Sequence, residues 1–107
     1  MTSNQHAHFQ APEKEFEVLL FAALREAAAA DRILVRVPVS EVDNQGGNDA
    51  TLTVGDLLAH CGEQYPVLLP WLPYTKVAVN CAYAGMHQPV RVGDEIALLP
   101  PVAGGAV

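Results

Sequence analysis

Residues 53–66 read TVGDLLAHCGEQYP, and this stretch has the strongest helix pattern in the chain. Thr53 is a good N-cap, and Asp56, three residues later, completes a capping-box arrangement. Pro66 ends the pattern because proline lacks the amide hydrogen that a helix interior needs. We therefore predict one main amphipathic helix over residues 53–65. Apolar side chains at the i, i+3, i+4 and i+7 spacing form its buried stripe: Val54, Leu57, Leu58 and Cys61.

Two strand-like segments precede this helix. Residues 15–21, EFEVLLF, alternate between an apolar set and a set that begins with glutamates, so Phe21 falls on the more open face. Residues 32–39, RILVRVPV, alternate in the same way, and Pro38 suggests an edge strand. Between them, residues 22–31 are rich in alanine and predict a short helix. We expect the two strands to be neighbours. The core-facing set of the first strand is Phe16, Val18 and Leu20.

Shorter elements follow the main helix. Residues 67–75, VLLPWLPYT, form an apolar connection broken by prolines. Residues 76–80, KVAVN, predict a strand, and residues 80–85 suit a turn and a short return strand. Residues 95–99, EIALL, predict the last strand, in which Leu99 shares a face with a glutamate. One long helix on one face of a mixed sheet is an α+β arrangement, and the sequence leaves the strand order open.

Length and composition indicate one compact domain with mobile ends. The chain has 107 residues, half of them apolar, which suffices for one hydrophobic core. A formal net charge of −6 argues against nucleic acid as a partner. Residues 1–14 lack the apolar core of a signal peptide, and no segment approaches the roughly 20 apolar residues of a membrane span. We expect a cytoplasmic protein with no membrane partner, a flexible N-terminal tail at 1–14 and a domain at 15–99.

The sequence contains no catalytic or metal-binding pattern. Cys61 and Cys81 form no CxxC pair, and no histidine has a zinc-type spacing from either. We expect two reduced, partly buried thiols. His6 and His8 lie in the predicted tail and are expected to be solvated. Because no Ser/His/Asp or Cys/His arrangement is present, any reaction must be catalysed by a partner.

The chain ends PPVAGGAV, and this end predicts a slender flexible tail over residues 100–107. Pro100 and Pro101 cannot continue a sheet and favour an extended conformation that leads away from the domain. From the first proline to the second glycine the tail can reach about 20 Å, at roughly 3.3 Å per residue. Gly104 and Gly105 have no Cβ and can enter a narrow channel. The tail therefore suits delivery of an acyl group to another protein; the alternative is a frayed terminus.

Another glycine pair cannot do the same chemistry. Gly46-Gly47 lies within residues 40–52, which contain the turn-forming run NQGGND. This pair is internal and has no terminal carboxylate, so we predict a mobile loop there.

Four segments together resemble the small subunit of molybdopterin synthase: VLLFAALREAAAAD, TVGDLLAHCGEQYP, KVAVN and VRVGDEIALLPPVAGG. The resemblance covers residues 16–105 in order. It implies a β-grasp, ubiquitin-like fold with a mixed sheet packed against one main helix. It also implies a non-catalytic sulfur donor that binds no cofactor. A ubiquitin-activating-like enzyme uses ATP to adenylate the terminal glycine, here Gly105, which then becomes a thiocarboxylate. The tail then enters the large synthase subunit.

The resemblance also implies which residues meet the partners. Mapped onto this chain, the arm is Pro100, Pro101, Val102, Ala103, Gly104 and Gly105. Apolar docking contacts are implied near the first and last strands, which a β-grasp fold pairs. Phe21 and Leu99 would meet there, and Tyr83 on the return strand would be their neighbour. The alternative is that loops or the N-terminal tail cover these side chains.

The end of the chain departs from the family. Chains of the family end at the second glycine, whereas this chain continues with Ala106 and Val107. While both remain, Gly105 has no free carboxylate. The resemblance thus implies either a precursor that a peptidase trims or a chain inactive in sulfur transfer. Three other functions stay open: a ubiquitin-like protein modifier, a sulfur carrier for thiamin, cysteine or tRNA thiolation, and a structural binding module with an unprocessed tail.

Overall fold

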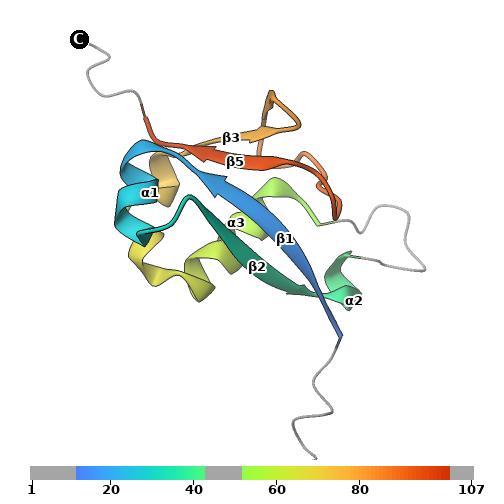
Figure 1. Cartoon of the computed structure of the whole chain (residues 1–107). Coiled ribbons are helices and arrows are strands. Elements are labelled where there is room, and N and C mark those ends of the chain that lie inside the picture. The colour runs from blue at the N-terminus through green and yellow to red at the C-terminus, as the bar shows by residue number, and fades with distance from the viewer. Residues whose placement is uncertain (1–11, 43–51, 102–107) are drawn as a thin grey trace, which may run out of the picture.

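The computed structural model describes residues 12–42 and 52–101, shown in Figure 1. The described residues hold no helix long and apolar enough to cross a membrane. The helices and strands, in chain order, are β1 (Glu13–Leu20), α1 (Ala22–Ala28), β2 (Arg32–Pro38), α2 (Val39–Val42), α3 (Val54–Gln64), the 3₁₀ helices η2 (Pro66–Leu68) and η3 (Leu72–Tyr74), β3 (Lys76–Val79), β4 (Ala82–Ala84) and β5 (Ile96–Leu99).

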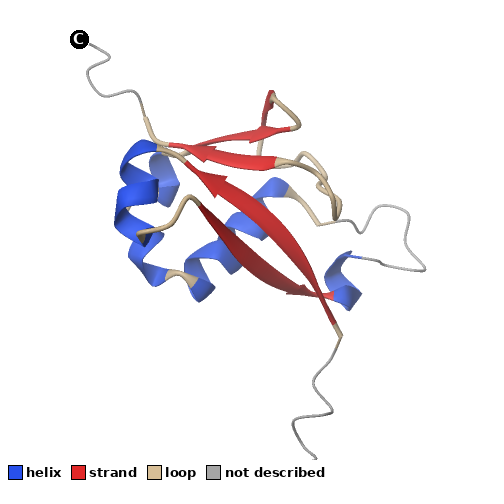
Figure 2. Cartoon of the chain, in the orientation of Figure 1, coloured by secondary structure: helices blue, strands red, loops and turns tan. Residues whose placement is uncertain are grey.

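The strands form one mixed sheet in the order β2-β1-β5-β3-β4. β1 is antiparallel to β2 and parallel to β5, and β3 is antiparallel to both β5 and β4. Figure 2 shows α1 and α3 close together against the sheet, whereas α2 lies apart at the far end of β1 and β2. The first and last strands thus lie side by side in its middle, and β2 lies at an edge. The predicted α+β, β-grasp architecture with one main helix is confirmed.

The core lies between the sheet and the helices, where strand alternation and helix spacing meet. The apolar set of β1 is buried to within 1% exposure, as predicted, and so is Cys61 on α3. Two further residues, Leu52 and Val90, lie outside the predicted elements but are equally buried. Their backbones are linked by a hydrogen bond from Val90 N to the Leu52 carbonyl (2.9 Å), which seals this end of the core. The remaining buried apolar residues include Leu24, Val35, Val37, Leu57, Leu68, Ile96 and Leu98.

Helix α3 begins as the sequence predicts. Thr53 Oγ1 accepts a hydrogen bond from Asp56 N (3.2 Å), and Asp56 Oδ2 accepts one from Thr53 N (3.1 Å), which completes the capping box. The next two amides, of Val54 and Gly55, donate to carbonyls of the loop before Val90. Unpaired amides at a helix start need partners, so these contacts fix the start of α3 against the loop between β4 and β5.

The structure differs from the prediction most at β1, α1 and α2. β1 begins at Glu13, within the predicted tail of residues 1–14, because Glu13 and Lys14 pair with the far end of β2. α1 ends at Ala28, earlier than predicted. Ala29 adopts a left-handed conformation (φ 58°) that ends the helix and lets the chain return as β2. α2 is a single short turn in a region predicted as strand and loop.

Cys81 is exposed, which corrects the expectation of a partly buried thiol. Asn80 and Cys81 form the two-residue connection between the paired residues Val79 and Ala82, and their φ values are +53° and +72°. Two positive φ angles are typical of a type I′ hairpin turn, whose second position favours glycine. The turn therefore points the Cys81 side chain away from the core.

Replacing Cys81 by glycine is expected to stabilise the domain by about 0.5–1 kcal/mol, since a side chain with Cβ is strained at this φ. Chemical denaturation of Cys81→Gly and the unmodified protein measures the difference. Asn80→Gly is the matched control and should destabilise the domain. The Asn80 side chain accepts a hydrogen bond from Glu95 N (2.9 Å) and donates one to Asp94 Oδ1 (3.1 Å). A stability loss in Cys81→Gly would contradict the strain argument.

Candidate functional site

The residues predicted to dock a partner gather around one groove at the end of β5. This feature, here called the arm-root groove, has a volume of about 710 Å³. Three predicted docking residues and the first two residues of the predicted arm line it together. The full lining is Phe21, Ala22, Ala23, Trp71, Lys76, Tyr83, Leu99, Pro100 and Pro101.

Strand register explains why residues so far apart in sequence meet here. In the parallel pair β1–β5, Leu20 lies opposite Leu98. The residues that follow these two, Phe21 and Leu99, therefore lie at the same end of the sheet. On the other side of β5, Leu99 lies opposite Lys76 of β3. Because Leu98 is fully buried, its neighbour Leu99 faces the opposite side, away from the helices. The groove therefore lies around the end of the sheet, where Leu99 and Lys76 come from the face away from the buried core and Ala22 and Ala23 come from the first turn of α1.

The groove walls are open to solvent. Phe21 is 41% exposed and Tyr83 is 75% exposed, so no described loop covers either ring. Leu99 and Pro100 are half-buried, and Pro101 is exposed. Large exposed aromatic and aliphatic side chains clustered around a hollow are typical of protein-binding surfaces. The expected exposure of Phe21 is confirmed, and its binding role stays a prediction.

Lys76 gives this apolar surface a positive charge. It is the one charged residue that lines the groove, and its side chain is exposed. A lysine can lay its aliphatic stem along an apolar wall and keep its ammonium group in water. Since the chain as a whole carries a net charge of −6, this cation stands out against an acidic background. The groove suits a partner that offers an apolar side chain beside a carboxylate.

The described part of the domain has no assembled metal centre. Within it, no three His, Cys, Asp or Glu side chains lie close enough to hold a metal ion. Burial raises the pKa of the Cys61 thiol to about 11, which keeps this thiol protonated at pH 7. Cys81 is a free, exposed thiol whose Sγ lies 3.8 Å from Glu95 Oε1.

The structure and the sequence prediction overlap in part. Val102, Ala103, Gly104 and Gly105 of the predicted arm lie outside the described residues, as do Ala106 and Val107. Sequence reasoning missed Trp71 and Lys76 as lining residues. Trp71 stands between two prolines of the connection before β3, and Lys76 shares strand parity with the outward-facing Ala78. Their proximity to the arm depends on strand order, which periodicity alone does not give.

Comparisons with known proteins place the chain among relatives that match most of its length. The ThiS family matches residues 18–105. The molybdopterin synthase sulfur carrier subunit of Dictyostelium discoideum is 31% identical over 93 residues, covering 85% of this chain and 96% of that protein. Its namesake from Mycobacterium tuberculosis is 36% identical over 88 residues, covering 82% and 94%. The crystal structure of small archaeal modifier protein 1 from Haloferax volcanii has a TM-score of 0.64 and 30% identity, covering 86% of this chain and 100% of that chain.

Proposed function

The chain belongs to the ThiS family, and from this membership we propose that it is the sulfur carrier subunit of a molybdopterin synthase. Two relatives of that name are more than 30% identical over more than four-fifths of this chain. The structural observation that supports this proposal is the arm-root groove. Its walls join the predicted docking residues directly to Pro100 and Pro101, where the predicted arm leaves the sheet.

The proposed chemistry takes place at the carboxylate of Gly105. A carboxylate is a poor electrophile, so a partner enzyme first joins it to the AMP part of ATP. The Gly105 oxygen attacks the α-phosphorus, pyrophosphate leaves, and an acyl-adenylate forms. Hydrosulfide, supplied by the sulfur donor, then attacks the acyl carbon, AMP leaves, and a thiocarboxylate results after loss of the sulfur-bound proton. This chain supplies the acyl group and the extended tail that delivers it, while the partner supplies ATP binding and catalysis. The domain itself needs no bound cofactor.

Each residue of the arm has a physical role in this scheme. Pro100 and Pro101 restrict the backbone to extended conformations, which keeps the arm from folding back onto the sheet. Gly104 and Gly105 lack Cβ, so a partner channel can close tightly around them. Val102 and Ala103 are the small apolar spacers between these two pairs.

The arm-root groove is the proposed docking surface for two different partners. The adenylating enzyme and the large synthase subunit must each receive the same arm, so each must cover its root. Phe21, Leu99 and Tyr83 provide the apolar contact, and Lys76 pairs with a partner carboxylate at the rim. Because both partners need this surface, they bind in turn and never together. Both steps belong in the cytoplasm, where ATP is available.

Ala106 and Val107 make the encoded chain a precursor in this proposal. While they are attached, the Gly105 carbonyl is part of a peptide bond and cannot react with ATP as a carboxylate. The β-branched side chain of Val107 would also obstruct a channel shaped for glycine. A peptidase that removes the two residues is therefore a third partner.

A second candidate function is protein modification, in which the trimmed Gly105 is joined to lysine side chains of other proteins. The likeness to small archaeal modifier protein 1, at 30% identity, favours this alternative. It needs the same trimming and the same adenylation, but a lysine amine replaces sulfur as the nucleophile.

Intact mass spectrometry of the protein from its own cells tests the proposal. We expect loss of one alanine and one valine, and replacement of one oxygen by sulfur. Co-purification with a large synthase subunit would assign the carrier to molybdopterin synthesis rather than to another sulfur pathway. Adducts on lysines of other proteins support the modifier instead. An unchanged full-length mass during active cofactor synthesis would rule out both and leave a binding module.

A further inference from the structure

β2 presents a long sheet edge that needs protection. It is seven residues long and has β1 as its neighbour on one side, while the opposite edge strand, β4, is three residues long. An edge strand exposes unpaired amides and carbonyls, and another strand can add to them. Of the two edges in the described sheet, β2 therefore offers the longer template for strand addition.

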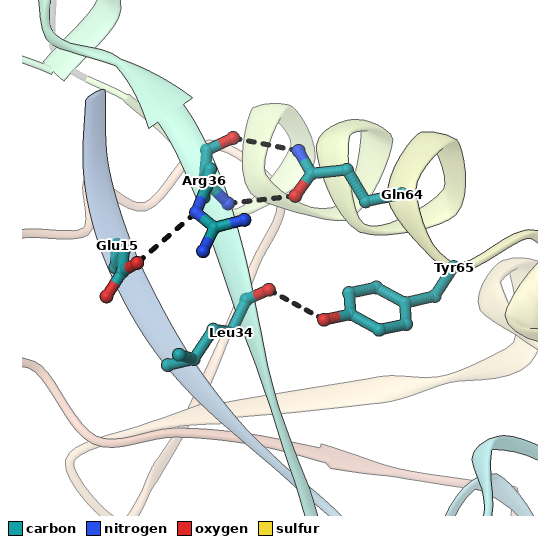
Figure 3. Close-up of polar contacts among 5 residues, drawn as sticks. All are labelled: Glu15, Leu34, Arg36, Gln64 and Tyr65. Atoms are coloured by element: carbon teal, nitrogen blue, oxygen red, sulfur yellow. Dashed lines mark hydrogen bonds and ion pairs between the residues drawn. The ribbon is translucent and has the colours of Figure 1, made fainter. Parts of the chain in front are cut away.

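The side chain of Gln64 occupies this edge in the place of a neighbouring strand (Figure 3). Its Oε1 accepts a hydrogen bond from Arg36 N at 2.9 Å, and its Nε2 donates one to the Arg36 carbonyl at 2.8 Å. A primary amide offers the same donor and acceptor pair as a peptide group. Gln64, at the last turn of α3, thus satisfies both outward main-chain groups of Arg36.

Two neighbouring residues also cover or shorten the exposed edge of β2. Tyr65, the residue after Gln64, donates its hydroxyl hydrogen to the Leu34 carbonyl at 2.9 Å, as Figure 3 also shows. Pro38, at the end of β2, has no amide hydrogen to offer. Hydrogen bonds from the end of α3 therefore cover main-chain groups of two alternate residues of β2, Leu34 and Arg36.

We infer that Gln64 and Tyr65 close the edge of β2 against the β2 strand of a second copy of this chain. Antiparallel pairing of two such strands about Leu34 would place Leu34, which is 43% exposed, against its counterpart. It would place Arg32 of each copy opposite Arg36 of the other. Arg36 Nε already lies 3.2 Å from Glu15 Oε2, and Arg32 is paired with Glu17, so these arginines do not repel a second copy strongly. The uncovered edge would be self-complementary.

Sedimentation velocity of the full-length double variant Gln64→Ala/Tyr65→Phe tests this inference. The unmodified protein is expected to sediment as a monomer at every concentration. The double variant is expected to self-associate as its concentration rises from micromolar to millimolar. In dilute solution the Arg36 amide of the variant should exchange its hydrogen about tenfold faster than in the unmodified protein. On association, this amide should regain its protection.

The controls separate edge closure from general loss of polarity or of folding. Glu63→Ala, on the same turn of α3, removes an exposed polar side chain whose carboxylate lies 3.7 Å from His60 Nδ1, and it should stay monomeric. Gln64 is exposed, so Gln64→Ala alone leaves no cavity and repeats the test with weaker association. A double variant that stays monomeric although its Arg36 amide exchanges faster would overturn the inference. Association that leaves the amides of β2 unprotected would overturn it as well.

Discussion

A chain shortened to end at Gly105 is expected to gain a thiocarboxylate from the adenylating enzyme and sulfur donor of its own cells, whereas the full-length chain gains none. The cause is chemical rather than conformational. Adenylation requires a free carboxylate oxygen, and in the full-length chain the Gly105 carbonyl belongs to a peptide bond. Intact mass spectrometry after incubation with the partner enzymes and ATP measures the yield.

Two further chains make this prediction specific to the glycine. The shortened chain carrying Gly105→Val has the same free carboxylate but a β-branched side chain at the reacting end. Its yield should fall sharply while its thermal stability stays unchanged, since residue 105 lies beyond the last strand. Thiocarboxylate formed directly on Val107 of the full-length chain would contradict both the trimming step and the proposed role of the diglycine.

Two adjacent leucines on β5 are expected to have opposite effects when replaced by alanine. Leu98 is fully buried, so Leu98→Ala should lower the free energy of unfolding by about 2–5 kcal/mol. Leu99 is half-buried and lines the arm-root groove, so Leu99→Ala should lower it by less than about 1 kcal/mol. Binding of the large synthase subunit should weaken about tenfold or more in Leu99→Ala.

Urea denaturation and calorimetric titration with the large subunit separate the two effects. Leu98→Ala binds with nearly unchanged affinity at temperatures where it remains folded, because its side chain faces the helices. Tyr83→Ala serves as a second groove variant and should resemble Leu99→Ala in both measurements. Equal binding by Leu99→Ala and the unmodified chain would remove the groove from the docking surface.

Periodicity predicted the parts of the fold that depend on near neighbours in sequence. The alternation around Phe16 and Val18, and the helical spacing from Val54 to Cys61, each identify the buried face without reference to the rest of the chain. The capping pair Thr53 and Asp56 places the start of α3 for the same reason.

The features that were missed depend on contacts between distant segments. α1 ends early because the chain must reverse at Ala29 to reach β2, although every alanine that follows favours a helix. Lys76 joins the groove only once β3 is placed beside β5. The two hydrogen bonds between Gln64 and Arg36 form only when α3 and β2 are in their final positions. The docking residues were predicted because the family resemblance supplied the pairing of the first and last strands.

The central position of β5 has a consequence during protein synthesis. Val18 of β1 pairs with Ile96, so the middle of the sheet stays incomplete until nearly the whole chain has left the ribosome. Contacts between such distant residues form late, after the local helices. A nascent or prematurely terminated chain therefore lacks both its middle strand and the proline-led end that follows it. Only a chain that has completed β5 can therefore present the predicted arm.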